Sequence, residues 1–246
     1  MSKLNIMTIN TQHKLCKYAH LYIQLINIYN IDILLCQDTG PISSSKDFTC
    51  NGFSIKYSKF DPDDTYGQVA TIYSNLLCKN ISFETNTNRF QVIKLTTNTT
   101  SLNIINIYIR PKDKIPQDKL SIIDVNNTII AGDLNSTANP KRDRSPPSNK
   151  TKEPPVSDLL EKGFLDVFRF FHSGEDKFSR IGYFKYTDQI PPKSRIDYFL
   201  IDPNLTTICL DCDILQDLNL VSDHCPVILK LNLKIEKTNK QIRKKY

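Results

Sequence analysis

The sequence predicts an α/β fold that is rich in β-strands and has helices between them. Short runs that are apolar or alternate in polarity recur along the chain, which is typical of strands. The runs lie around residues 4–10, 32–36, 52–59, 68–74, 90–96, 102–109, 128–131, 196–201 and 227–233. Between the first two, apolar side chains recur at helical spacing from Leu15 to Tyr29, which predicts an amphipathic helix packed on a sheet. A chain of 246 residues is long enough for one domain with a sizeable core.

The segments between these runs have the composition of loops. Residues 41–47 are rich in Pro and Ser, and residues 61–64 form an acidic turn. Residues 112–125 are expected to form a loop and a short helix. Residues 139–155 contain five prolines, which exclude the interior of a helix or a sheet. This last segment is either a floppy insertion or a loop that reaches a polyanion.

Three strand ends carry polar side chains, and each is ambiguous when considered alone. Asp133 and Asn135 lie two apart after an apolar strand, so an extended chain would point both to one side. An Asx turn explains the same pair without any function. Asp197 is a single carboxylate in an otherwise apolar strand, where it needs a partner. His224 follows Asp223 just before the last strand, and a lone histidine there is more often structural. Together, the three strand ends favour an active site.

These stretches resemble the signatures G-D-x-N, R-[IL]-D-Y and S-D-H-x-P of the endonuclease/exonuclease/phosphatase superfamily. The other signatures of that superfamily occur in order along the chain. They are a first strand ending in Asn10, a second strand followed by Asp38-Thr39, the G-x-V-A strand Gly67–Ala70 and the N-x-Y strand Asn106–Pro111. The resemblance covers about residues 4–233. It implies a four-layer sandwich of two mixed β-sheets flanked by helices, as in DNase I-like proteins.

Within the superfamily, the sequence is most similar to the endonuclease domains of LINE-type (non-LTR) retrotransposons, which are relatives of apurinic endonucleases. Residues 158–169 resemble their helix and L-x-D-x-x-R passage, and Tyr108–Pro111 resembles their Y-x-R-P form. This resemblance implies a Mg²⁺-dependent hydrolase that nicks DNA and leaves a 3′-hydroxyl and a 5′-phosphate.

The resemblance also implies where the metal binds. Asp38 stands where the family has its metal-binding Glu, with Asn10 and Asp223 supporting the metal side. Mg²⁺ is the expected ion because it prefers carboxylate and water ligands, and Mn²⁺ is a possible substitute. Asp38 is one methylene shorter than Glu, and the family's glycine-containing turn after Asn10 is replaced by Thr11-Gln12-His13. The shorter Asp38 implies a metal contact that is longer or mediated by water. In the altered turn, His13 either lines the cleft or, as is more common, is a surface residue at the start of a helix.

The remaining roles follow from the same resemblance. Asp133 is expected to orient or deprotonate the attacking water. His224 is expected to contact a phosphate oxygen, with Asp197 holding its tautomer and favouring its charged form. The other catalytic candidates would donate hydrogen bonds to substrate or to neighbouring carboxylates, and they are Asn10, Asn135 and Tyr108.

Basic side chains outside the strands are the candidates for binding DNA. The stretch from Phe178 to Arg195 interleaves basic and aromatic residues, which suits a hairpin that touches DNA. The candidates are Arg180, Lys185 and Lys193 in this stretch, Lys141, Arg142 and Arg144 in the proline-rich segment, and Arg110. From residue 230 onward there are seven basic residues and one acidic residue, so this end carries the whole net charge of +6. We therefore divide the chain into a catalytic domain, residues 1–235, and a basic tail, residues 236–246. The tail either adds affinity for nucleic acid or is a solvated end.

Composition limits the environment and the partners. No apolar run approaches the roughly 20 residues of a membrane span, and the N-terminus lacks the layout of a signal peptide. We expect an intracellular protein, with the nucleus a candidate compartment and no membrane partner. The seven cysteines are odd in number and lack zinc-finger spacing, so reduced thiols are expected. We expect a monomer whose partner is its DNA substrate.

Three functional hypotheses stay open at this point. The first is the DNA-nicking endonuclease. The second is a phosphoesterase of the same fold that acts on abasic DNA, RNA, a lipid or an inositol phosphate. The third is a catalytically weakened relic that only binds nucleic acid, which Asp38 and the altered turn suggest.

Overall fold

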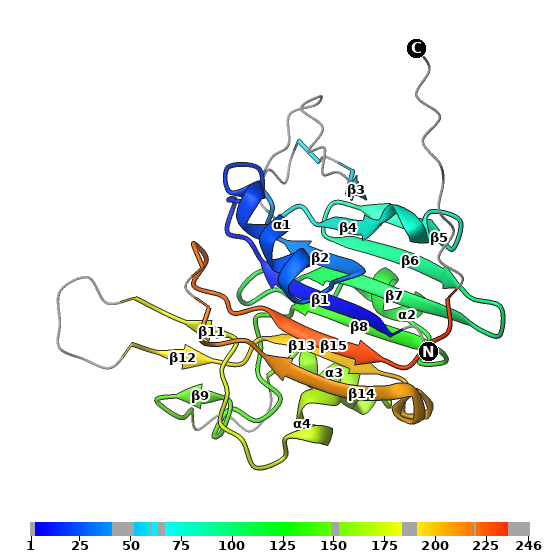
Figure 1. Cartoon of the computed structure of the whole chain (residues 1–246). Helices are drawn as coiled ribbons and strands as arrows, with labels where there is room; N and C mark the ends of the chain where they lie inside the picture. The colour runs from blue at the N-terminus through cyan, green and yellow to red at the C-terminus, as the bar shows by residue number, and fades with distance from the viewer. Residues whose placement is uncertain are drawn as a thin grey trace.

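The computed structural model describes residues 3–40, 52–59, 61–62, 67–148, 153–183, 191–218 and 220–235 (Figure 1). Two six-stranded sheets pack face to face, and helices lie on their outer faces. The predicted four-layer α/β sandwich is confirmed. The boundary between a domain of residues 1–235 and a tail stays a prediction, because residues 236–246 lie outside the described residues.

The first sheet is built around the parallel pair β1 and β2. Its order is β14-β15-β1-β2-β4-β3, and its other neighbouring pairs are antiparallel. Its strands are β1 (Leu4–Asn10), β2 (Ile33–Gln37), β3 (Phe53–Tyr57), β4 (Ala70–Ser74), β14 (Cys209–Ile214) and β15 (Val227–Leu231). The helix α1 (Ala19–Ile28) covers the outer face of this sheet with Tyr22, Leu25 and Ile26. Because α1 begins later than the helical spacing predicted, Leu15 is buried from a turn.

The second sheet repeats this plan around the parallel pair β7 and β8. Its order is β10-β13-β8-β7-β6-β5. Its strands are β5 (Ile81–Thr87), β6 (Phe90–Thr96), β7 (Ser101–Tyr108), β8 (Thr128–Asp133), β10 (Leu165–Asp166) and β13 (Asp197–Ile201). The helices α2 (Gln117–Ile122) and α3 (Val156–Glu161) lie against its outer face.

Alternation along the strands divides the apolar side chains between the layers. Ile104 and Ile129 point between the two sheets, whereas their neighbours Ile105 and Ile130 face α2 and α3. Each such fully buried side chain stabilises the fold by about 1.5–3 kcal/mol. The helix α4 (Val167–Phe171) adds Phe168 to the core between the sheets. Two 3₁₀ helices complete the elements, Asn75–Leu77 and Pro203–Ile208.

A three-stranded sheet projects beside the sandwich (Figure 1). It has the order β11-β12-β9 and consists of β9 (Arg144–Ser145), β11 (Arg180–Ile181) and β12 (Lys193–Ser194). The antiparallel pairing of β11 with β12 confirms that the stretch from Phe178 to Arg195 is a hairpin. The candidate Lys185 lies outside the described residues.

The structure bears on two expectations from the sequence, the state of the cysteines and the length of apolar helices. All cysteines in the described ranges are free thiols, including Cys209 and Cys212 on β14. None of the helices in those ranges is both long enough and apolar enough to cross a membrane.

Candidate active site

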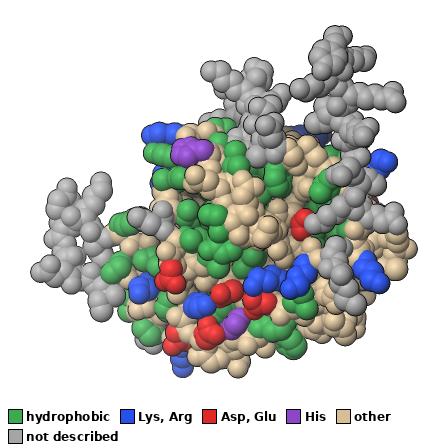
Figure 2. Space-filling model, in the orientation of Figure 1, with side chains coloured by type: hydrophobic (Ala, Val, Ile, Leu, Met, Phe, Trp, Pro, Cys, Tyr) green, Lys and Arg blue, Asp and Glu red, His purple; other side chains and the backbone are tan. Residues whose placement is uncertain are grey.

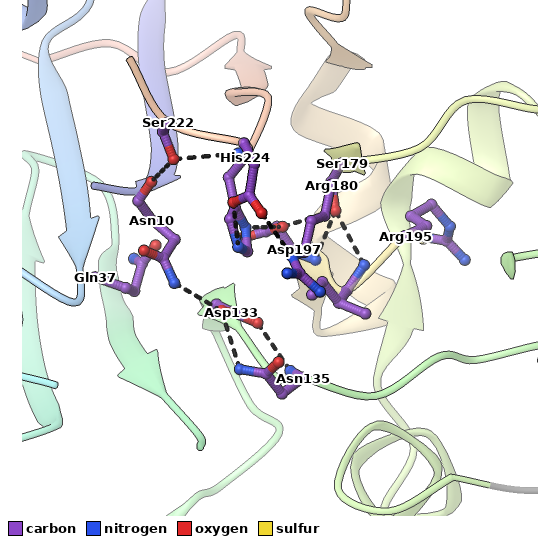
Figure 3. Close-up of polar contacts among 12 residues, drawn as sticks. Asn10, Gln37, Asp133, Asn135, Ser179, Arg180, Arg195, Asp197, Ser222 and His224 are labelled. Carbon is purple, nitrogen blue, oxygen red and sulfur yellow. Dashed lines mark hydrogen bonds and ion pairs between the residues drawn. The ribbon is translucent and has the colours of Figure 1, made fainter. Parts of the chain in front are cut away.

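One edge of the sandwich collects polar strand ends from both sheets (Figure 3). The parallel strands β1, β2, β7 and β8 all finish there, and β13 begins there. Asn10 is paired with Gln37 in the first sheet, and Asp133 lies between Tyr108 and Asp197 in the second. The topology therefore brings together residues from distant parts of the chain.

Asp133 is the buried carboxylate at the centre of this edge. Its Oδ2 atom accepts hydrogen bonds from Asn10 Nδ2 at 2.9 Å and from Asn135 Nδ2 at 3.1 Å. Burial and the negative charge of Asp197 raise the pKa of Asp133 to about 7, although the nearby His224 and these hydrogen bonds oppose the rise. The carboxyl group is thus poised to exchange a proton near neutral pH.

Asn135 reaches Asp133 through a turn and not through an extended strand. Its φ is +47°, and its backbone N–H donates to Asp133 Oδ1 at 2.8 Å. The Asx turn is therefore present and the extended geometry is not, although the Asn135 amide still reaches Asp133. The functional interpretation of the pair stays a prediction. The side-chain amide also donates to Ile109 O at 2.8 Å, which fixes its orientation.

His224 and Asp197 form a buried ion pair beside Asp133. The two are linked by His224 Nδ1 and Asp197 Oδ2 at 2.9 Å, and Ser179 Oγ donates to the same Asp197 oxygen at 2.7 Å. Burial alone would lower the pKa of His224, but the charge and hydrogen bond of Asp197 raise it to about 9. The site therefore presents an imidazolium ion at neutral pH.

Asp223 points to a different set of partners from Asp38. Gln12 Nε2 donates to Asp223 Oδ1 at 2.5 Å, and Arg180 Nε donates to Asp223 Oδ2 at 3.1 Å. These contacts tie the turn after β1 and the hairpin strand β11 to the segment before β15. We infer that Asp223 holds Arg180 at the site. Within the described part of the chain, no group of three or more metal-ligand side chains contains both Asp223 and Asp38.

Asp38 follows β2 in a left-handed conformation, with φ of +47°. Its Oδ1 atom lies 3.0 Å from Nε2 of His13. Burial raises the pKa of Asp38, although the charges of His13, His224 and Arg110 oppose the rise. His13 is thus a neighbour of the candidate metal ligand, which the sequence alone did not establish.

Tyr108 ends β7 with its side chain buried in the same region. Burial and the charges of Asp38 and Asp133 raise the pKa of its phenol well above the ordinary range. The hydroxyl therefore stays protonated and available as a hydrogen-bond donor.

A cavity of about 160 Å³ joins these residues. It is lined by Asn10, Gln12, Asp38, Tyr108, Pro111, Asp133, Asn135, Arg180 and His224. A second cavity of about 570 Å³ shares Asn135 and Arg180 with it and adds Lys112, Lys114 and Arg144. A small polar pocket thus adjoins a larger one with basic side chains on its wall.

The small cavity has a donor set that fits a divalent cation. Asp38, Asp133, Asn10 and Asn135 offer the oxygen ligands that Mg²⁺ and Mn²⁺ prefer. Burial raises the pKa of both carboxyl groups, so a bound cation would favour their ionised forms.

A different placement of the cation is suggested by distance alone. Among the described residues, Asp133, Asp197 and His224 have ligand atoms within 4.8 Å of one another. In this group, His224 Nδ1 is already paired with Asp197 Oδ2 at 2.9 Å, so these two side chains compensate each other's charge. We therefore favour the Asp38 side.

The candidates for DNA contact differ in their partners and in whether they line a cavity. Arg142 is paired with Asp176 at 3.1 Å, and Arg144 is paired with Glu153 at 2.7 Å, so both hold the proline-rich segment in place. Arg180 and Arg144 line the cavities, and Lys193 lies on β12 beside them. Lys141 is exposed and Arg110 is half-buried, and neither lines the cavities described above.

Several residues of the site carry no sequence signal of their own. Ser179 and Gln12 are ordinary polar residues, and they act by fixing Asp197 and Asp223. Only the three-dimensional pairing of β11 with the segment before β15 could reveal them.

Solved structures with the same fold include several nucleases. AP endonuclease LMAP from Leishmania major matches with a TM-score of 0.74 and 15% identity, over 94% of this chain and 88% of that chain. The endonuclease domain of TRAS1, a telomere-specific non-LTR retrotransposon, matches with a TM-score of 0.69 and 16% identity, over 94% and 99%. The 3′ phosphatase NExo from Neisseria, bound to a product DNA hairpin, matches with a TM-score of 0.69 and 18% identity, over 94% and 100%. At these identities, the likeness shows the fold.

Sequence comparison gives the assignment that the fold alone does not. No curated protein matches this chain significantly. The model of the Endonuclease/Exonuclease/phosphatase family matches residues 7–224, which include every strand end of the site. The chain belongs to the endonuclease/exonuclease/phosphatase family.

Proposed function

We propose that this protein is a metal-dependent endonuclease that hydrolyses phosphodiester bonds of DNA and leaves a 3′-hydroxyl and a 5′-phosphate. The observation that carries the proposal is the convergence of Asp133, His224, Tyr108 and Asp38 around one small cavity. A base, a cation, a neutral donor and a candidate metal ligand are the groups that phosphodiester hydrolysis needs.

Each residue has a role that follows from its partners. Ionised Asp133 accepts a proton from the attacking water, while Asn10 and Asn135 hold its carboxylate in place. The imidazolium of His224 donates a hydrogen bond from Nε2 to a non-bridging phosphate oxygen. Asp197 fixes the orientation of the ring through Nδ1. Tyr108 donates a second hydrogen bond to the phosphate. A bound divalent cation would supply charge neutralisation for the phosphoryl group and for the leaving 3′ oxygen.

The charge distribution supports a polyanionic substrate at this edge. The wall of the larger cavity has four basic side chains and two acidic ones, so its net charge is positive. The basic residues are Lys112, Lys114, Arg144 and Arg180, and the acidic residues are Asp113 and Glu153. This cavity shares Asn135 and Arg180 with the small one. Elsewhere, acidic and basic side chains are mixed along the face over β14 and β15 (Figure 2). There, Lys230 is paired with Asp211 at 3.0 Å and Lys177 with Asp213 at 2.6 Å. Such mixed charge attracts a phosphate backbone weakly, so DNA is expected at the cavity edge.

The similar structures point the same way. One is named as an AP endonuclease, one as a retrotransposon endonuclease domain and one as a 3′ phosphatase bound to DNA. All three names describe hydrolysis of phosphoester bonds in DNA, which supports DNA as the substrate here. Within this class, we favour internal nicking of the LINE-type because of the motifs described above.

A plasmid-nicking assay tests the proposal. The purified protein should relax supercoiled plasmid in Mg²⁺ or Mn²⁺ and not in EDTA. Asp133→Asn should reduce the rate by about 10²-fold or more, the scale for losing one acid–base group. Asp124→Asn is the matched control, because Asp124 is exposed on the loop before β8, at the far end of that strand. Equal nicking by the Asp133 variant would contradict the proposal, and cleavage only of abasic DNA, RNA or inositol phosphates would replace it with the corresponding alternative.

A further inference from the structure

The turn after β1 and the turn after β2 face each other in an uncommon backbone conformation. Gln12, His13 and Asp38 have φ values of +48°, +59° and +47°, a region that residues other than glycine seldom adopt. Such outliers persist where the surroundings impose them, and they concentrate at ligand sites. Gln12 and Asp38 line the small cavity of the candidate active site, and His13 contacts Asp38.

Backbone hydrogen bonds fasten the two turns together. His13 N donates to Asp38 O at 2.7 Å, and Thr11 N donates to Gln37 O at 2.8 Å. Gly40 leaves room for the imidazole, because a Cβ atom there would lie 3.0 Å from His13 Nδ1 and 3.2 Å from His13 Cβ. The position of the imidazole ring is therefore built into the turn and is not a chance rotamer of a surface side chain.

The side chains of this pair have the spacing of two ligands on one ion. His13 Nε2 and Asp38 Oδ1 are 3.0 Å apart. Two adjacent ligands at right angles, each about 2.1 Å from a metal, are also about 3.0 Å apart. This is also the length of an ordinary hydrogen bond, and a cation bound here would take the place of the proton between the two atoms. Asp38 also lines the cavity that contains Asp133 and Asn10.

We propose that His13 and Asp38 together bind the catalytic cation, and that the imidazole nitrogen makes the site prefer a first-row transition-metal ion to Mg²⁺. The inference deepens the proposed function, on which it rests. Mg²⁺ binds oxygen ligands almost exclusively, whereas an imidazole nitrogen suits transition-metal ions. The nitrogen ligand also compensates for Asp38, whose carboxylate is one methylene shorter than the Glu that the family has at this position.

Pulsed electron paramagnetic resonance of the full chain loaded with Mn²⁺ tests the nitrogen ligand directly. The spectrum should show a ¹⁴N coupling from a bound imidazole. The coupling should disappear in His13→Asn, since asparagine tolerates the left-handed backbone but has no imidazole. It should persist in His20→Gln, whose side chain is exposed on α1. No coupling in the unaltered protein would overturn the proposal.

The same measurement tests the other candidate site for the cation, the group Asp133, Asp197 and His224. If the coupling survives His13→Asn and disappears in His224→Gln, the ion lies with Asp133, Asp197 and His224, and the proposal is wrong. The chain has four histidines. If His13→Asn fails to fold, coupling that persists in single variants of His20, His172 and His224 assigns it to His13, and loss in any of these overturns the proposal.

Isothermal titration calorimetry measures the preference of the site for Mn²⁺ over Mg²⁺. The unaltered protein should bind Mn²⁺ at least about tenfold more tightly than Mg²⁺, and His13→Asn should remove most of that preference by weakening Mn²⁺ alone. A preference unchanged in the variant would contradict the role of His13. Neither readout depends on nicking, so failure of the nuclease proposal and failure of this one are distinguishable.

Discussion

The proton on His224 decides whether the site can contact a phosphate with a positive charge. Burial would lower the pKa of this imidazole, but Asp197 raises it to about 9, above the ordinary value of about 6.5. The cation is therefore present at neutral pH and is lost as the pH rises through about 9. In the metal-free protein, an NMR titration should find this value. Asp197→Asn should bring the pKa to about 6.5 or below, since burial then dominates.

A control for this titration lies at the other end of the same strand. Asp202 follows β13 and accepts a hydrogen bond from Asn127 N at 2.8 Å, far along the sheet from His224. Asp202→Asn should leave the titration of His224 unchanged. If both variants shift it alike, the pairing with Asp197 is not the cause of the raised pKa.

At the same scale, the sequence predicted the charged residues better than their partners. Asp133, Asp197 and His224 could be chosen because a charge at the end of an apolar strand is costly and needs a reason. His13 and Gln12 could not, because their contact with Asp38 and Asp223 depends on a left-handed turn that no local pattern announces. The roles themselves stay predictions until the variants are measured.

Gly132 lies on β8 directly beside Ile107 of β7, in a backbone conformation that only glycine adopts readily. Its φ is +145°, and a Cβ atom there would lie 1.9 Å from Ile107 O on the neighbouring strand β7. Gly132→Ala should therefore force β7 and β8 apart and lower the free energy of unfolding by about 2–4 kcal/mol, from overpacking and backbone strain together. Urea denaturation followed by circular dichroism measures the change.

Gly163→Ala separates the two causes. Gly163 also has a positive φ, of +106°, but an added Cβ would meet nothing within 4 Å. The Gly163→Ala variant should lose only the free energy that the backbone strain costs, about 1 kcal/mol. Equal losses in the two variants would show that the close approach of β7 and β8 costs nothing.

Asp143 holds the proline-rich segment against two arginines, one just before β13 and one on α4. Its buried carboxylate accepts from Arg195 Nη2 at 3.0 Å and from Arg169 Nη2 at 2.5 Å. Asp143→Ala leaves the buried guanidinium of Arg195 with less compensation, and it should cost about 3–5 kcal/mol. Asp176→Ala is the matched control, because its pair with Arg142 is exposed and is worth at most about 1 kcal/mol. Similar melting temperatures for the two variants would contradict the view that the Asp143 carboxylate holds the proline-rich segment in place.

This anchoring shows what element-level patterns miss. The prolines of residues 139–155 correctly excluded a regular helix, but they left open whether the segment is ordered. Its described part is held by Asp143 and by the two-residue strand β9, which is too short for any periodicity to predict. β5 was missed as well, because its half-buried position at the edge of a sheet tolerates a largely polar sequence. The buried central strands, by contrast, were found where the apolar runs placed them.

Across the whole molecule, a net charge of +4 out of the total of +6 lies in residues 236–246, outside the described residues. Deleting residues 236–246 removes five basic residues and one acidic residue. If these contact phosphates, the slope of log affinity against log salt should shrink by roughly 0.9 for each lost contact. A variant with the five basic residues changed to Gln keeps the length and should behave like the deletion. An unchanged slope in both would leave binding to the cavity edge alone.

The pairing of β1 with β15 has a consequence for larger assemblies. Leu4 is opposite Leu231, so the chain enters and leaves the sandwich side by side, at the end of these strands remote from Asn10 and Asp133 (Figure 1). A protein module joined before Leu4 or after Ile235 would start from that remote side and leave the catalytic edge uncovered. The two points of attachment thus share one side of the domain, opposite the edge of the proposed active site, whichever end is joined to a longer polypeptide.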